Sequence, residues 1–232
     1  MEAIDPWSLP HVKYFYAMPL VTNFTNDILP YADFSLLGIE EKDLPVSLKD
    51  LLDLCGGIPS PSITGVRIEI FATFSSAFAV RICSDQYEAV RNMDFSIGRI
   101  DNNYLFINEQ GKCIGTNLFL NQFQAARDNG FKRIHLTAMA PSEEEPDWSG
   151  YYFWACLGFQ HADVNEFEAW AKTMGRKEPT LSDLMQTETG RMLWKATGFT
   201  WIGDFFLTEG YKCITHLKAH LQRKGIDFPI DP

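Results

Sequence analysis

The chain has 232 residues, 46% hydrophobic and 14% aromatic, which is enough apolar material for a substantial core and argues against intrinsic disorder. Acidic residues outnumber basic ones by 30 to 20, and the resulting net charge of −10 disfavours broad contact with nucleic acid or anionic lipid. No apolar run is long enough to predict a membrane span, and the acidic start does not resemble a signal peptide. Five widely spaced cysteines without a CxxC pair suit free thiols in a reducing cytosol, so a cytoplasmic location is expected.

The first third of the chain predicts an irregular segment followed by strands. Residues 1–62 are rich in proline, but residues 44–54 have helical spacing with Ser47 as the N-cap. Two alternating, β-branched segments, 65–74 and 77–84, predict a hairpin joined at Ser75-Ser76.

The middle of the chain predicts a strand, a helix and a second strand in succession. Residues 87–100 supply a further strand, and Asn102-Asn103 predicts a turn before an extended run at 103–109. A helix then runs from Thr116 to a glycine stop at Asn129-Gly130. Residues 131–138 read as a buried strand. This order is a β-α-β unit, whose two strands are expected to be parallel neighbours.

Helices dominate the rest of the prediction. A helix over residues 148–157 is stopped by Gly158-Phe159, after an acidic loop at 141–146. Beyond residue 163 the pattern is mostly helical: 165–174, 181–187 and 209–224.

The loop between the strand at 103–109 and the following helix is the most informative segment. Gly111 and Gly115 let the backbone approach a ligand closely, and the first turn of a helix offers unpaired N–H donors at the positive end of its dipole. A strand, a glycine turn and a helix start in this order predict a site for a diphosphate-bearing cofactor. The alternative is an ordinary surface turn before a helix, without a ligand.

Two segments resemble one known family. Gln110-Gly-Lys-Cys-Ile-Gly115 resembles the Q/R-x-x-G-x-G/A acyl-CoA loop of the GNAT superfamily of N-acyltransferases, and residues 150–159 resemble its later helix, which ends in Gly-Phe. The likeness covers roughly residues 65–160. It implies an α/β fold with a GNAT-like central mixed β-sheet flanked by helices and a C-terminal helical extension. The implied parts of one domain are an N-terminal segment at 1–62, an acyl-CoA-binding core at 63–160 and an extension at 161–232.

The resemblance also implies a cofactor site, with acetyl-CoA or another acyl-CoA as co-substrate. Backbone groups of Phe106 and Ile107 would pair with the pantetheine arm, and Asp147 falls where relatives carry an asparagine that touches this arm. The residues that would cradle the pyrophosphate are Gln110, Gly111, Lys112, Cys113, Ile114, Gly115 and Thr116. Cys113 departs from the family by replacing the middle glycine.

The implied chemistry is direct attack of an amine on the thioester in a ternary complex, helped by positioning and proton transfer. Glu109 is the candidate base acting through water, or else a solvated acid at a strand end. Trp154 stands where the family often has a tyrosine that acts as general acid, and either Tyr151 or Tyr152 could replace it.

Other reactive residues have plainer interpretations. His135 lies in an apolar strand, where a hydrogen-bonded core or face residue is the more common role. Cys213, His216 and His220 share one helix face, a spacing compatible with metal ligands, but no second cluster completes a set and no metal is expected. The aromatics Trp194, Phe199 and Trp201 are most simply core, or else the wall of an acyl pocket.

The sequence therefore favours an N-acyltransferase, most simply an N-acetyltransferase. Its expected partners are acyl-CoA and an amine, either a small molecule or a peptide, with no nucleic acid and no membrane. The oligomeric state stays open. One alternative is a catalytically inactive CoA-binding or protein-interaction module, which Cys113 and Trp154 favour. Another is an acyltransferase with a longer-chain or carrier-protein-bound donor, whose pocket the aromatic extension would line.

Overall fold

A computed structural model describes residues 20–24, 44–58, 63, 66–74, 77–108, 112–143, 149–208 and 210–229, of which 20–24 and 71–74 by backbone alone. The chain divides into two compact units, Met1–Lys132 and Arg133–Pro232. The predicted division at residues 62 and 160 of a single domain stays a prediction.

The first unit is built on an antiparallel sheet whose strands follow one another in chain order. Its strands are β1 (Leu20–Phe24), β2 (Val66–Phe74), β3 (Ala77–Cys83), β4 (Tyr87–Asp94) and β5 (Arg99–Ile107). The predicted hairpin of residues 65–74 and 77–84 is confirmed as β2 and β3, which pair from Arg67 opposite Cys83 onwards. Its connection, Ser75-Ser76, lies outside the described residues.

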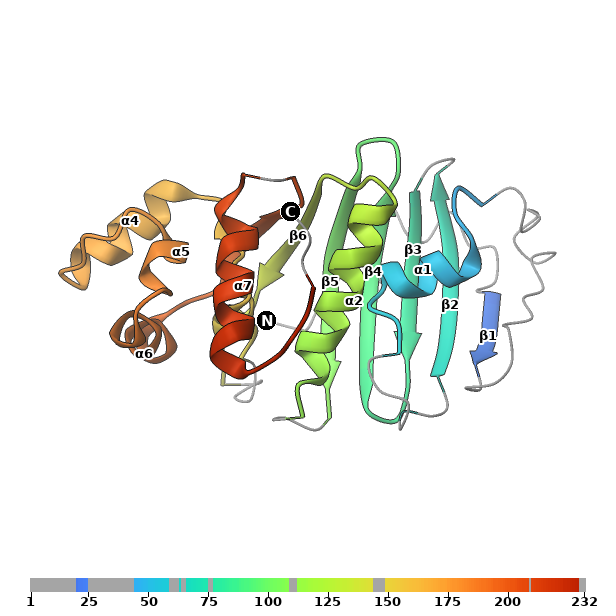
Figure 1. Cartoon of the computed structure of the whole chain (residues 1–232), viewed down its shortest axis with the longest axis horizontal. Coiled ribbons are helices and arrows are strands. Elements are labelled where there is room, and N and C mark those ends of the chain that lie inside the picture. The colour runs from blue at the N-terminus through green and yellow to red at the C-terminus, as the bar shows by residue number, and fades with distance from the viewer. Residues whose placement is uncertain are drawn as a thin grey trace. The chain divides into compact units, whose positions relative to one another are not determined.

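Two helices, α1 (Leu48–Leu54) and α2 (Ile114–Asp128), lie on one face of these strands (Figure 1). The predicted N-cap is confirmed, since the Ser47 hydroxyl accepts a hydrogen bond from the Asp50 amide at 3.1 Å. The predicted end of α2 is also confirmed: Asn129 caps it, and Gly130 follows with φ of 73°. The helix begins at Ile114, two residues earlier than Thr116.

The predicted turn at Asn102-Asn103 is wrong, because both residues belong to β5, which continues to Ile107. The turn lies at residues 95–98, where the Asp94 carboxylate accepts hydrogen bonds from the Ser96 and Ile97 amides. Asn102 fits inside the strand because its buried side chain exchanges two 2.9 Å hydrogen bonds with Gln122 of α2. A strand can hold a polar side chain when a facing element satisfies it.

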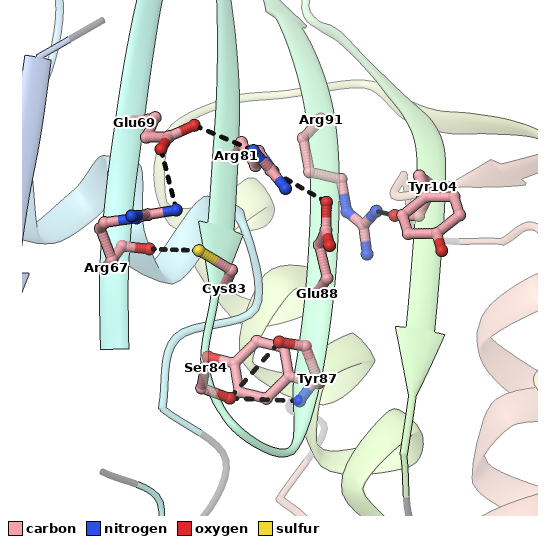
Figure 2. A network of polar contacts seen from close by, with 9 residues as sticks. All are labelled: Arg67, Glu69, Arg81, Cys83, Ser84, Tyr87, Glu88, Arg91 and Tyr104. Carbon is pink, nitrogen blue, oxygen red and sulfur yellow. Dashed lines mark hydrogen bonds and ion pairs between the residues drawn. The ribbon is translucent and has the colours of Figure 1, made fainter. Parts of the chain in front are cut away.

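A β-bulge interrupts β5 at Asn103. Val90 of β4 pairs with Tyr104, whereas Arg91 pairs with Asn102, so Asn103 is the extra residue. Arg91 is 2% exposed, and its Nη1 donates to the carbonyl of Val90 and to that of Tyr104, the second of which is drawn in Figure 2. Burial lowers the pKa of Arg91 to about 10. The guanidinium thus satisfies backbone oxygens where the ladder is irregular.

A row of charged side chains crosses β2, β3 and β4 on the face opposite to the one on which α1 and α2 lie (Figure 2). Glu69 on β2 contacts Arg67 at 3.2 Å and Arg81 of β3 at 3.3 Å, and Arg81 reaches Glu88 of β4 at 2.8 Å. Opposite charges on neighbouring strands each add a few tenths of a kcal/mol to about 1 kcal/mol. Their main consequence is to favour this register of β2, β3 and β4 over a slipped one.

The second unit contains three antiparallel strands and five helices in its described part. The strands are ordered β6 (Arg133–Ala138), β8 (Trp201–Phe206) and β7 (Gln160–His161). The helices are α3 (Gly150–Cys156), α4 (Val164–Thr173), α5 (Leu181–Leu184), α6 (Glu188–Thr197) and α7 (Lys212–Lys224). Each predicted helix after residue 148 is present, but β7, β8 and α6 were not predicted. The predicted β-α-β motif consists of β5, α2 and β6. Because β5 and β6 belong to different compact units, their parallel pairing stays a prediction.

Aromatic side chains form the core of this second unit, which confirms that interpretation of Trp194 and Trp201. These two are 0% and 1% exposed, and their indole N–H groups both donate to the Tyr151 carbonyl, at 3.1 and 3.0 Å. Phe199 packs edge-on against Trp194 at 5.4 Å between ring centroids. The shared carbonyl joins α3, α6 and β8.

The expected α/β class is confirmed: both units combine paired strands with helices, and the chain carries a C-terminal helix, α7. Among the described residues, no helix has both the length and the apolar character needed to cross a membrane.

Candidate functional site

The first turn of α2 lacks a side-chain cap. Its N-cap, Cys113, makes no side-chain capping bond, and the first turn carries no acidic residue. At this end of the helix the Asn117 amide donates to the Cys113 carbonyl at 2.9 Å. The amides of Ile114, Gly115 and Thr116 therefore have no acceptor within the helix, and they carry the positive end of its dipole.

Cys113 adopts a backbone conformation that glycine prefers. Its φ of 58° and ψ of 12° lie in the left-handed region, and it is the non-glycine residue with positive φ in the described part of the chain. The turn therefore keeps the shape expected of a glycine although a thiol is present. The Cys113 side chain is exposed, as is that of Lys112 beside it.

The end of β5 has the predicted strand geometry. Phe106 and Ile107 pair with Glu88 and Tyr87 of β4, and the Asn108 amide donates to the Gln86 carbonyl at 2.9 Å. Alternate residues of an antiparallel strand direct their backbone groups to opposite sides. The backbone N–H and C=O groups of Phe106, like those of Asn108, are therefore directed toward β4. Those of Ile107 are directed away from β4.

Four predicted site residues, Glu109, Gln110, Gly111 and Asp147, lie outside the described residues, and their roles stay predictions.

The two tyrosines of α3 have different surroundings. The Tyr151 hydroxyl donates to the Lys195 carbonyl of α6, whereas the half-buried Tyr152 ring lies 5.7 Å from the Lys195 ammonium. Burial raises the pKa of Tyr152 to about 12 and also raises that of Tyr151. Both phenols therefore hold their protons at neutral pH. The Tyr151 hydroxyl is engaged by a backbone carbonyl and the Tyr152 hydroxyl by the Cys156 side chain, so the surroundings do not single out one of the two as the acid.

The Gly158-Phe159 stop and Trp154 have structural roles. Gly158 has φ of 99°, and a Cβ there would lie 2.7 Å from the Cys213 carbonyl of α7. Only glycine allows this turn and this approach. Trp154, 7% exposed, packs edge-on against Phe159 at 5.2 Å. Trp154 is thus a core residue.

A histidine and an aspartate meet on the second unit's strands. His135 of β6 pairs with Asp204 of β8, and their Nδ1 and Oδ1 atoms lie 2.9 Å apart. Arg133 also reaches Asp204, with Nη1 and Oδ1 separated by 3.7 Å. Of these residues, only His135 was a candidate from the sequence. Asp204 could have been found only through the alternation of residues 201–206, which identifies β8 as a strand.

The candidate metal ligands on α7 are core side chains. Cys213, His216 and His220 are buried, at 0%, 8% and 7% exposure. Burial lowers the pKa of His216 and His220 and raises that of Cys213 to about 11. Within the described ranges, no cluster of three or more histidine, cysteine or acidic side chains is arranged to hold a metal ion.

Comparison with known proteins gives a weak structural likeness. No protein-family model and no curated protein matches the chain. Among solved structures, a crystal structure of nourseothricin acetyltransferase is similar at a TM-score of 0.31 and 12% identity. The match covers 56% of this chain and 63% of that one, so it spans less than two thirds of that protein.

Proposed function

We propose that the protein is an acyltransferase that binds acyl-CoA at the start of α2 and transfers the acyl group to an amine. The observation that carries the proposal is the uncapped first turn of α2, preceded by Cys113 in the left-handed conformation. Three amides without an acceptor in the helix and a nearby lysine suit the linked phosphates of a nucleotide. The resemblance of residues 110–115 and 150–159 to the GNAT motifs selects acyl-CoA among such nucleotides.

The proposed roles follow the order of the chain. The amides of Ile114, Gly115 and Thr116 hold the pyrophosphate, with Lys112 adding charge attraction at the surface. The Ile107 backbone, directed away from β4, pairs with the pantetheine arm. Glu109 serves as a base through water, and Tyr151 or Tyr152 as the acid toward the departing thiolate. Direct attack on the thioester requires mainly that the reacting atoms be held in position.

The test is acetyl-CoA binding to the full chain, measured by calorimetry and by thermal stabilisation. A ligand at 100 times its dissociation constant stabilises the folded state by about 2.7 kcal/mol. Gly115→Glu places a carboxylate in the second position of α2, where it repels phosphate and occupies its space. Because Gly115 is buried, circular dichroism first checks that the variant folds, and the folded variant should lose the stabilisation.

Asn165→Glu is the matched control. Asn165 is exposed and is likewise the second residue of its helix, α4, so the variant adds the same charge at the same helical position. We expect unchanged affinity for acetyl-CoA. Equal affinities in both variants and the parent chain would show that the start of α2 is not the site. Binding without thiol release across a panel of amines would identify a non-catalytic module, and tighter binding of a long-chain acyl-CoA would identify a longer donor.

A further inference from the structure

Basic side chains gather where three helices of the second unit are in contact. Helix α3 packs against both α6 and α7. Arg191 and Lys195 lie on α6, and Arg223 and Lys224 belong to the last turn of α7. We call these four residues the basic cluster. In a chain whose net charge is −10, such a cluster creates a local positive field against an acidic background.

Two side chains of α3 show that the basic cluster converges from both neighbouring helices. The Lys195 ammonium lies 5.7 Å from the centroid of the Tyr152 ring. Burial raises the pKa of Tyr152 and of Cys156, and Arg191 and Arg223 both oppose this rise. The two guanidinium groups therefore lie near the same turn of α3, although they come from different helices.

The positive charges of the basic cluster are not balanced by acids. Burial and the nearby Arg191 lower the pKa of Arg223. Burial, followed by Arg223, Lys224 and Arg191, lowers the pKa of His220 to about 4. No carboxylate is among the groups that act on Arg223 or His220. In the part of the chain that the structure describes, the four cations thus repel one another without a carboxylate contact.

Arg191 is held in position for a ligand. Its Nη1 donates to the carbonyls of Met185 and Gln186, at 3.0 and 3.1 Å. These bonds fix the plane of the guanidinium and leave its Nε and Nη2 without an acceptor among the described residues. A fixed guanidinium with free N–H groups can bind phosphate through two parallel hydrogen bonds.

The rival interpretation is that these cations only stabilise helix ends. Lys195, Arg223 and Lys224 lie in last turns, where positive charge favours the helix dipole, and Arg191 bonds to carbonyls that follow α5. This interpretation accounts for each residue singly. It does not account for the convergence of four cations without a counter-charge, which costs free energy until an anion binds.

We propose that the basic cluster binds a small molecule that carries phosphate groups. The two arginines supply forked N–H donors, and the two lysines add positive charge. Several cations within one cluster favour a compact polyanion over a single carboxylate. The site uses residues of the second unit only and does not depend on the proposed acyltransferase function.

The probe is inorganic pyrophosphate, titrated into the full chain by calorimetry and followed by the backbone amide resonances in nuclear magnetic resonance. The resonances are needed because pyrophosphate also suits the start of α2. Shifts at Arg223 and Lys224 would locate the ligand at the basic cluster. The test variant is Arg223→Gln with Lys224→Gln. Both side chains are exposed, so the variant should fold, which circular dichroism checks.

In this variant the affinity of the site should fall at least roughly tenfold, because charge-assisted hydrogen bonds are lost. The shifts in the last turn of α7 should disappear with it. Lys172→Gln with Lys177→Gln is the matched control, since it removes the same charge from two other exposed lysines of the second unit. We expect unchanged affinity in the control.

Three results would overturn the proposal. The first is a parent chain whose amide resonances at the end of α7 do not respond to pyrophosphate. The second is an equal loss of affinity in both double variants, which would show general attraction by surface charge. The third is tighter binding of a poly-glutamate peptide than of pyrophosphate at the same resonances, which would identify a surface for an acidic protein.

Discussion

Replacement of Cys113 by glycine should stabilise the first unit. The left-handed conformation costs an ordinary L-residue about 1–2 kcal/mol, and glycine avoids this cost. Glycine loses about 0.5–1 kcal/mol more conformational entropy on folding, so the net gain expected for Cys113→Gly is about 0.5–1 kcal/mol. The exposed thiol makes no capping bond, so its removal should leave no cavity and no lost hydrogen bond.

Urea unfolding followed by far-ultraviolet circular dichroism measures this difference. Cys113→Ala is the matched control: alanine also lacks the thiol but keeps the Cβ, so its stability should stay within about 0.5 kcal/mol of the parent. If glycine and alanine have equal effects, φ at this position is not positive and the described helix start is wrong. Acetyl-CoA affinity should be retained in both variants.

Two further predictions concern titratable groups. Burial raises the pKa of Cys55 to about 12 and that of Cys213 to about 11, so in the native protein a thiol reagent should modify exposed Cys113 fast and half-exposed Cys83 slowly. Cys113→Ala should remove the fast phase, and a fast phase that survives would contradict the exposures. Burial also lowers the pKa of His220 from 6.5 to about 4, so the unfolded chain protonates first as the pH falls. The contribution of neutral His220 to the free energy of unfolding is complete above pH 6.5. It should fall toward pH 4 by up to about 3 kcal/mol. His220→Gln should flatten this dependence in acid unfolding, and an unchanged slope would show that other groups cause it.

Local signals in the sequence were reliable where one element determines its own ends. Ser47 and Asn129-Gly130 mark helix ends through bonds that their neighbours make, and the Gly158-Phe159 stop reflects a positive φ. Asn102-Asn103 misled because its polarity suggested a turn, whereas a partner twenty positions along the chain, Gln122, satisfies Asn102 inside the strand. The sequence of one segment does not reveal such a distant partner.

The candidate site was predictable in part for the same reason. The order of strand, glycine loop and helix pointed to the start of α2, a local feature. The partner of His135 was missed because residues beyond 163 were expected to be mostly helical, so the alternation of buried and exposed residues in β8 was overlooked. The left-handed backbone of Cys113 was equally hidden, since cysteine has no preference for that conformation.

The burial of the tryptophans, two of which donate to the Tyr151 carbonyl, has a spectroscopic consequence. Trp154, Trp170, Trp194 and Trp201, all at most 9% exposed, belong to the second unit, so their emission should report its unfolding. Cys55, fully enclosed in the first unit, offers a complementary reporter through its labelling rate. Recorded side by side along one denaturant series, the two signals would reveal whether both units lose their structure in a single cooperative event.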